Sequence, residues 1–278
     1  MMLVVGAEGL VGRALFQAFK ESGVPAVGTG RKGGGDLLAL DLAQPEKFQI
    51  PKGVRTAVVC AGMGGLAACA SDPVFTRKVN VQGSASLAQA LALHGCQVIY
   101  LSTNLVFDGD QPRPFSTDSP RPGCEYGVQK AELEKLLQGK FFACVRLTKV
   151  MESLRGRFGE WLASLRAGEI LSTSTKLRFS PVSLLEVVRA LAEFANKFSP
   201  GTFHISGDRD FSYQEAALML AKAHSLPTER VTGDDHAGMN LFFRAPGGGC
   251  LQVQAPPGCS GWRFGPSLST LECFLKDL

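Results

Sequence analysis

The sequence lacks the features of a metal protein, a disulfide-bonded secreted protein or a membrane protein. Its eight cysteines form no Cys-x-x-Cys pair and stand at no metal-binding spacing to the four histidines. Most of them lie in apolar runs, so we expect buried thiols in a reducing compartment and no metal site. No apolar run approaches the roughly 20 residues that a membrane-spanning helix needs, and no basic segment precedes the first one. We therefore expect a cytoplasmic protein that has no membrane partner.

An excess of charge of one sign is also missing. The formal net charge is +4, and the basic residues are scattered among the acidic ones. This pattern does not favour a polyanionic partner, so we expect no nucleic-acid binding. No repeat of 20–50 residues is visible, which argues against a solenoid or a propeller.

What the sequence does contain is an alternation of strands and helices. The 278 residues are enough for one large α/β domain with a smaller lobe. Short apolar runs typical of buried strands lie at 1–5, 25–28, 56–60, 97–102 and 143–147, and helical spacing at 13–22, 73–94 and 127–138. Such an alternation implies right-handed crossovers, and it predicts an α/β fold with a Rossmann-type, doubly wound parallel sheet.

The regular alternation weakens after about residue 150. Helical patterns follow at 158–167, 182–196 and 213–224, a strand pattern at 202–206, and a glycine- and proline-rich stretch at 232–267. We therefore predict a nucleotide-binding domain over 1–150, to which 177–199 also returns. The remainder of 151–278 is predicted to form a smaller, partly interleaved substrate-binding lobe.

The first strand pattern runs directly into a glycine-rich turn, "GAEGLVG". Gly6 permits a sharp turn, Gly9 lets backbone N–H groups approach a pyrophosphate, and Gly12 allows close packing of helix on strand. A dinucleotide site is favoured over a merely structural tight turn, because the glycines stand between a strand and its helix. From this turn we expect cofactor contacts by Gly6, Glu8, Gly9, Leu10, Val11 and Gly12.

The end of the second strand distinguishes two forms of the cofactor. An acid there binds the ribose 2′-hydroxyl of NAD, whereas a cation suits the 2′-phosphate of NADP. The sequence offers Arg31 and Lys32 and no acid before Asp36. We therefore expect NADP(H), with NAD(H) as the alternative, although a solvated basic pair in a loop would explain the same residues. Further along the chain, cofactor contacts are expected from Asp41, Leu42, Cys60, Ala61 and Gly62.

Hydroxyl groups and a Tyr-x-x-x-Lys pair follow the fourth strand pattern. Ser102 and Thr103 end this strand, where ligands gather in open α/β sheets. Tyr126 and Lys130 are four residues apart, so on a helix they share one face. An ammonium beside a phenol favours the phenolate, which suits Tyr126 to proton transfer to or from a substrate carbonyl. The alternative is a tyrosine that packs by its ring and a solvated lysine.

These motifs together resemble the extended short-chain dehydrogenase/reductase superfamily, and within it the dTDP-4-dehydrorhamnose reductase-like branch. The resemblance rests on "GAEGLVG", "GTGR", "VNVQGSASLAQA", "LSTNLVFDG", "YGVQK", "VRLTKV" and "FSPVSLLEVVRAL". It implies an NADP(H) or NAD(H) cofactor, a nucleotide-linked sugar as substrate, and reduction of its 4-keto group. Proteins of this kind often pair through helices, so a homodimer is one expected assembly.

The resemblance also implies roles for single residues. Thr103, Tyr126 and Lys130 would form the catalytic triad, with Ser102 beside it. Asn80 matches an asparagine that supports the lysine in this family, although bonding to the neighbouring backbone is an equal alternative. Substrate contacts are expected from Asn104, Arg178 and Arg244. Arg146 could touch a phosphate or form a structural ion pair.

Two departures leave other functions open. Asn104 and Leu105 replace an acid and an aromatic that stand near the sugar in the reductases, which puts the usual keto-rhamnose substrate in doubt. The regulatory β subunits of methionine adenosyltransferase resemble the same branch and carry asparagine at this point, so a nucleotide-binding regulatory subunit is a second hypothesis. A nucleotide-sugar 4-epimerase is a third.

Overall fold

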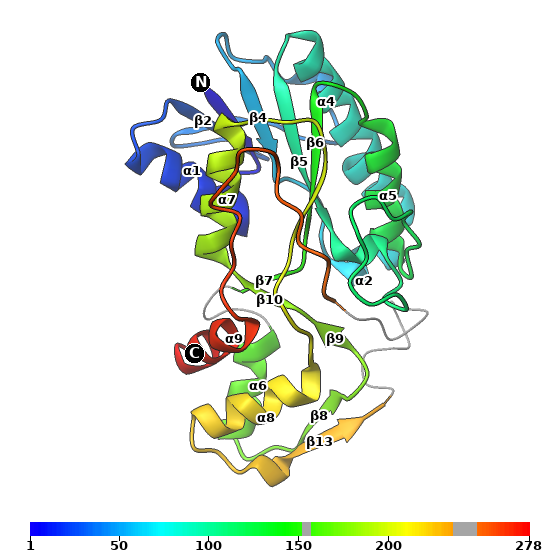
Figure 1. Ribbon diagram of the computed structural model, residues 1–278, viewed down its shortest axis with the longest axis vertical. Helices are drawn as coiled ribbons and strands as arrows, with labels where there is room; N and C mark the ends of the chain where they lie inside the picture. Colours follow the sequence, from blue (N-terminus) through cyan, green and yellow to red (C-terminus); the bar gives the residue numbers. More distant parts are fainter. Residues whose placement is uncertain (152–156, 236–248) are drawn as a thin grey trace.

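Seven parallel strands form the central sheet of the protein (Figure 1). The computed structural model describes residues 1–151, 157–235 and 249–278. The strand order is β3-β2-β1-β4-β5-β6-β11. The strands are β1 (Met2–Val5), β2 (Ala26–Gly30), β3 (Leu37–Ala39), β4 (Thr56–Val59), β5 (Gln97–Thr103), β6 (Phe142–Leu147) and β11 (Gly201–Ile205). This order reverses between β1 and β4, as in a doubly wound sheet, and the predicted Rossmann-type fold is confirmed.

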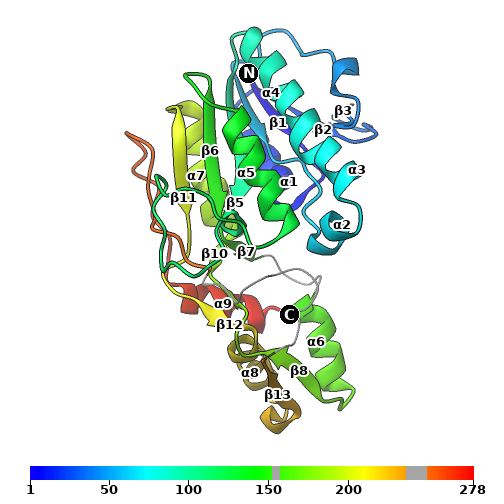
Figure 2. The same cartoon turned by 90° about the vertical axis from the view of Figure 1, so that its right-hand side faces the viewer.

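Helices cover both faces of this sheet, because each strand buries side chains on both sides. Leu3 and Val5 of β1 belong to one core cluster, whereas Val4 belongs to the other. In Figure 1, α1 (Leu10–Glu21) and α7 (Leu184–Asn196) lie to the left of the sheet. To the right lie α4 (Ser84–Leu93) and α5 (Glu125–Leu136), preceded by α2 (Leu66–Ser71), α3 (Pro73–Arg77) and the π-helical turn η2 (Lys78–Gly83). Figure 2 looks onto the right-hand face, where α3, α4 and α5 lie in front of the strands.

A smaller group of elements lies below the carboxyl edge of the sheet and has a core cluster of its own (Figures 1 and 2). Its helices are α6 (Arg157–Arg166), α8 (Tyr213–Ala223) and α9 (Ser267–Lys276). Its strands are β7 (Lys149–Met151), β8 (Leu171–Ser174), β9 (Arg178–Phe179), β10 (Pro181–Ser183), β12 (Phe211–Ser212) and β13 (Val231–Asp234), which pair two by two. Short 3-10 turns, η1 (Pro45–Lys47), η3 (Asn104–Val106) and η4 (Thr228–Arg230), complete the described elements.

The chain passes from the sheet to this smaller group and back. After β10 it returns along α7, which packs on α1, and then adds β11 to the edge of the sheet beside β6. The strand predicted at 202–206 therefore extends the large sheet. The sequence pattern did not reveal α9. In the glycine- and proline-rich stretch, residues 232–234 belong to β13, whereas the described residues 249–266 hold no regular strand or helix.

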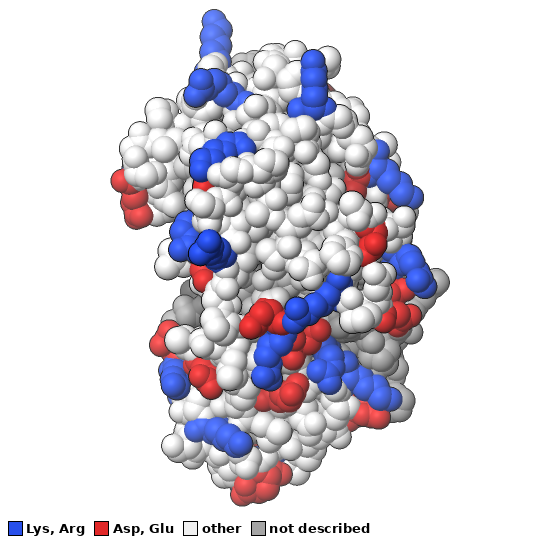
Figure 3. All heavy atoms as spheres, in the orientation of Figure 1, with Lys and Arg blue, Asp and Glu red and all other residues white. Residues whose placement is uncertain are grey.

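The surface and the thiols are consistent with the composition. On the face shown in Figure 3, acidic and basic side chains lie intermixed, and neither forms a continuous stripe. Six of the eight cysteines are buried, Cys60 is half-buried and Cys273 is exposed; all eight are free thiols. Within the described residues, no helix has the length and apolar character needed to cross a bilayer.

A buried polar network joins α5 to the strands beneath it. Arg146 on β6 forms an ion pair with Glu134 on α5, with 2.7 Å between Nη2 and Oε2, and both side chains are buried. The same carboxylate accepts a hydrogen bond from the Ser102 hydroxyl at 2.5 Å. Arg146 also donates to Nε2 of His204 on β11 at 3.2 Å, while His204 Nδ1 lies 3.1 Å from the Gln252 carbonyl. Of the two roles considered for Arg146, the structure shows the ion pair.

This network predicts a pH dependence of stability. Burial, with Arg146 alongside, lowers the pKa of His204 from 6.5 to about 4. Between these two pKa values His204 binds a proton in the unfolded chain but not in the folded protein, so the free energy of unfolding falls as the pH falls. We expect His204 alone to reduce the free energy of unfolding by up to about 3 kcal/mol between pH 6.5 and 4. Urea titrations across this range would measure it.

The matched variants are His204→Gln and His94→Gln, since His94 is exposed on the last turn after α4. The His204 variant should lose this component of the pH dependence, whereas the His94 variant should keep it. Equal slopes in the two variants would contradict the assignment.

Candidate cofactor and catalytic site

The turn between β1 and α1 brings three backbone segments into close contact. Gly6 has a φ of +85°, and a Cβ on it would lie 2.8 Å from atoms of Ala61. A Cβ on Gly12 would lie 2.2 Å from the carbonyl oxygen of Gly6, so only glycine permits this approach of helix and turn. Gly9 caps the start of α1 and leaves the N–H groups of the first helical turn free of side-chain caps. Such a turn suits a pyrophosphate at the helix N-terminus.

The loop after β4 is held against this turn by Asn80. The Asn80 amide accepts a hydrogen bond from Met63 N at 2.7 Å and donates one to Met63 O at 3.0 Å. It also donates to the buried Gln129 of α5 at 2.8 Å. A Cβ on Gly62 would meet Asn80 Oδ1 at 3.2 Å and Lys130 Nζ at 3.8 Å. Asn80 is therefore a positioning residue, which fixes a side-chain-free loop beside Lys130.

Tyr126 and Lys130 lie on the same face of α5, as their spacing predicts. The Lys130 ammonium is buried, donates to the Leu101 carbonyl at 2.9 Å, and lies 5.8 Å from the centre of the Tyr126 ring. A Cβ on Gly64 would come within 3.9 Å of the Tyr126 hydroxyl, so that this hydroxyl faces the loop after β4. The alternative considered from the sequence, a solvated Lys130, does not agree with the burial of this side chain.

The two hydroxyls at the end of β5 have different partners. The Ser102 hydroxyl donates to the buried carboxylate of Glu134, as described above. The Thr103 hydroxyl accepts from Leu105 N at 3.2 Å and contacts Asn104 Oδ1 at 3.4 Å. Thr103 is therefore better placed than Ser102 to exchange its weak partner for a substrate.

These elements enclose a cavity of about 340 Å³ at the carboxyl edge of the sheet. Its volume lies within the range of ligand pockets, about 300–1,000 Å³. Of the residues predicted from sequence, the cavity brings together Gly9, Leu10, Val11, Gly12, Cys60, Ala61, Gly62, Ser102, Thr103, Tyr126 and Lys130. Burial raises the pKa of the Cys60 thiol to about 12, so this thiol stays protonated and is a poor nucleophile.

The sequence analysis missed five residues that line the cavity: Gly64, Leu101, Leu147, Thr148 and Val150. Thr148 could have been found, because it follows β6, a neighbour of β5 whose carboxyl end reaches the same edge. Leu147 and Val150 are ordinary strand residues by pattern, and no signal in the sequence marks them as lining a site.

Other predicted residues lie outside this cavity. Glu8, Arg31 and Lys32 are exposed around the end of β2. Asp41 is also exposed and accepts a local hydrogen bond from Ala43 N, whereas Leu42 is buried in the core. Asn104 is half-buried at the start of η3, and Arg178 is exposed on β9. Arg244 lies outside the described residues.

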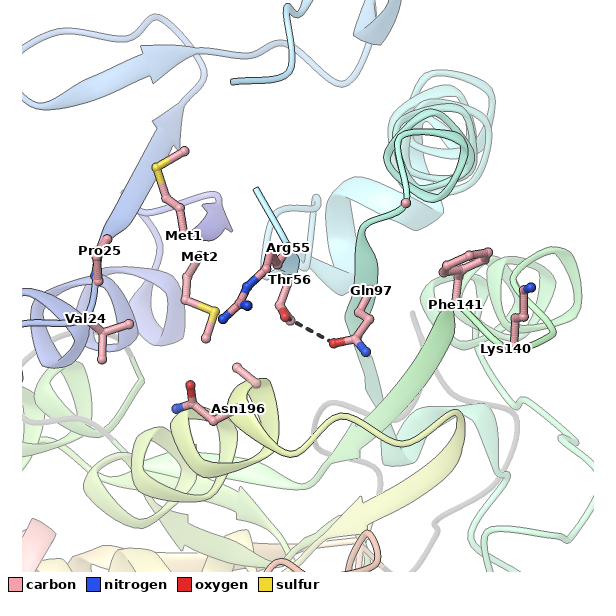
Figure 4. A pocket seen from close by; sticks show the side chains of 12 residues that line it. Met1, Met2, Val24, Pro25, Arg55, Thr56, Gln97, Lys140, Phe141 and Asn196 are labelled. Atoms are coloured by element: carbon pink, nitrogen blue, oxygen red, sulfur yellow. Dashed lines mark hydrogen bonds between the residues drawn. The ribbon is translucent and has the colours of Figure 1, made fainter. Parts of the chain in front are cut away.

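A larger cavity, of about 740 Å³, opens at the opposite edge of the sheet (Figure 4). Its lining includes Met2, Thr56 and Gln97, which start β1, β4 and β5. Thr56 donates to Gln97 at 3.3 Å, and the Arg55 side chain extends toward that of Met2 (Figure 4). Thr103, Tyr126 and Lys130 line the smaller cavity at the other edge, so the smaller cavity is the candidate for chemistry.

A seven-stranded Rossmann sheet with a Gly-x-x-Gly-x-x-Gly turn and a Tyr-x-x-x-Lys helix defines an extended short-chain dehydrogenase/reductase. Residues 1–254 match the RmlD substrate binding domain, and the chain belongs to that family. The residues of the small cavity fit a dinucleotide: the turn offers uncapped helical N–H groups, and glycines replace side chains where the cofactor would pass.

Three proteins resemble this chain in sequence or in fold. The chain is 29% identical to methionine adenosyltransferase 2 subunit beta of Rattus norvegicus over 257 residues, covering 83% of this chain and 74% of the relative. It superposes on the dTDP-4-dehydrorhamnose reductase of Bacillus anthracis in complex with NADP with a TM-score of 0.81 and 18% identity, covering 100% and 98% of the two chains. MoeE5 in complex with UDP-glucose and NAD gives a TM-score of 0.80 at 19% identity, covering 99% and 97%.

The close contact in the glycine turn leads to a prediction about stability. Gly12→Ala places a methyl group against the Gly6 carbonyl, so the turn and α1 must separate. We expect the free energy of unfolding to fall by about 1–3 kcal/mol, the usual cost of overpacking. The control is Gly9→Ala, whose Cβ would lie an ordinary 3.5 Å from the same oxygen. Chemical denaturation should show the smaller loss for the control; equal losses would contradict the steric argument.

Proposed function

We propose that this protein is an NAD(P)H-dependent reductase of a nucleotide-activated keto sugar. The observation that carries the proposal is the meeting of Thr103, Tyr126 and Lys130 with the glycine turn around one cavity. Proteins of the same fold include a reductase solved with NADP and a protein solved with UDP-glucose and NAD. These support a nucleotide cofactor together with a nucleotide-linked sugar; reduction of a 4-keto group is the reaction that this set of groups suits best.

Each residue then has a role in reducing the carbonyl. When bound, the cofactor supplies the hydride that adds to the carbonyl carbon. Tyr126 donates the proton to the carbonyl oxygen, and the nearby Lys130 ammonium stabilises the phenolate that remains. Lys130 is held by the Leu101 carbonyl, which leaves its other two N–H groups for a ribose. Thr103 donates a hydrogen bond to the same carbonyl oxygen and orients it.

A specific observation also supports a second candidate function, that of a nucleotide-binding partner subunit. The similarity to the methionine adenosyltransferase subunit spans most of the chain. In addition, Asn104 contacts the Thr103 hydroxyl that a reductase needs for its substrate. We rank this function second because a subunit without catalysis has no chemical need for the buried Lys130 beside Tyr126.

Turnover by the wild-type protein and by Tyr126→Phe tests the first proposal. The substrates are a panel of nucleotide 4-keto sugars, and the loss of NADH or NADPH absorbance is followed. Removal of the proton donor should lower kcat by about 10²–10⁴-fold while cofactor binding is retained. Tyr213→Phe is the matched control, since it removes a phenol from α8 in the smaller group of elements.

The same preparation separates the two candidate functions. Cofactor binding without turnover on any sugar, together with a stable complex with a methionine adenosyltransferase catalytic subunit in size-exclusion chromatography, would replace the reductase by the partner subunit. Turnover that survives Tyr126→Phe unchanged would refute the role given to Tyr126.

A further inference from the structure

We propose that Glu8 makes this site select NAD(H) over NADP(H) by accepting a hydrogen bond from the adenosine ribose. The inference rests on the proposed binding of a dinucleotide at the glycine turn. Arg31 and Lys32 after β2 had suggested the opposite preference, for NADP(H).

The Glu8 carboxylate lies directly over the carboxyl end of β2. A Cβ built on Gly30, the last residue of that strand, would lie 2.5 Å from Glu8 Cδ, 2.7 Å from Oε1 and 2.9 Å from Oε2. The backbone N–H of Arg31 donates to Oε2 at 2.9 Å. The carboxylate therefore occupies the space into which a side chain at position 30 would extend.

This space is where the cofactor's ribose is recognised in Rossmann folds. An acid at the end of the second strand accepts the hydrogen bond of the 2′-hydroxyl there. Gly30 supplies no side chain, and the next acid, Asp36, is exposed and bound to Lys20 at 2.8 Å. Glu8 reaches the same place from the neighbouring turn, so the strand needs no acid of its own.

The two dinucleotides differ in what they present to this carboxylate. NAD offers a 2′-hydroxyl, which can donate a hydrogen bond to Oε1 while Oε2 keeps the Arg31 N–H. NADP offers a phosphate, which carries a charge of about −1.5 to −2 at neutral pH and is therefore mainly a hydrogen-bond acceptor, as the carboxylate is. Like charges brought together in this way disfavour binding.

The basic pair does not reverse this choice. Arg31 and Lys32 are both exposed, so their attraction for a phosphate is weakened by water and salt. Glu8 is exposed as well, so its charge is screened in the same way, but its carboxylate is held at this place by the hydrogen bond from the backbone N–H of Arg31. The group that is fixed at the ribose position is thus the acid.

The experiment measures binding of NAD⁺ and NADP⁺ by isothermal titration calorimetry, with no sugar present. The wild-type protein should bind NAD⁺ at least tenfold more tightly than NADP⁺, a difference in binding free energy of about 1.4 kcal/mol. Glu8→Gln keeps an oxygen for the Arg31 N–H and removes the charge, so it should shift the ratio toward NADP⁺ by about tenfold.

The control is Glu21→Gln, which removes the same charge from the exposed end of α1, where Glu21 accepts a hydrogen bond from Gln17 of the same helix. Its NAD⁺ to NADP⁺ ratio should equal that of the wild type. A wild-type ratio at or below one, or a ratio that Glu8→Gln leaves unchanged, would overturn the inference. Absence of binding of both dinucleotides would overturn it as well.

Its failure is distinguishable from failure of the proposed reductase. NAD⁺ selectivity without turnover on any keto sugar would refute the reductase and leave the role of Glu8 standing. Turnover that prefers NADPH would do the reverse.

Discussion

The geometry of the candidate site depends on one face of α5 being held against the sheet by a buried carboxylate. Tyr126, Lys130 and Glu134 follow one another at intervals of four residues, so they lie in a row along this face. Glu134 is fixed by Arg146 and by the Ser102 hydroxyl, and Lys130 by the carbonyl of Leu101. A buried charge is tolerated only with such partners, so the helix has one register on β5 and β6. The phenol is thereby aimed at the cavity through an ion pair that lies outside it.

Much of the fold follows from local sequence patterns. The parts that could not be predicted in this way depend on contacts with residues distant in the sequence. The runs that form β1, β4, β5 and β6 are apolar because both of their faces are covered, and this made them recognisable. The edge strand β3 has only three residues, and β11 joins the sheet only through β6. The π-helical turn η2 is equally hidden, since it places Gly83 where a Cβ would lie 1.7 Å from the Leu42 carbonyl oxygen. No short stretch of sequence contains these contacts.

The candidate site divides in the same way. The glycines and the Tyr-x-x-x-Lys pair could be predicted because turn geometry and helix periodicity place them whatever the rest of the chain does. The true partner of Ser102 lies 32 residues away, and that of Asn80 is a backbone 17 residues earlier. A hydroxyl at a strand end therefore suggested catalysis from sequence, whereas the structure commits it to the network that holds α5.

Cofactor recognition shows why position in the sequence is an incomplete guide to chemistry. The rule that an acid at the end of the second strand marks NAD concerns where a carboxylate stands in space, and the strand is only its usual source. Here the turn after β1 and the end of β2 are adjacent because their strands pair in parallel, Val5 opposite Thr29. A glycine at position 30 removes the strand's own side chain and so admits one from the turn. The absence of an acid from β2 and the presence of one at Glu8 are thus two parts of a single arrangement, and neither can be interpreted without the other.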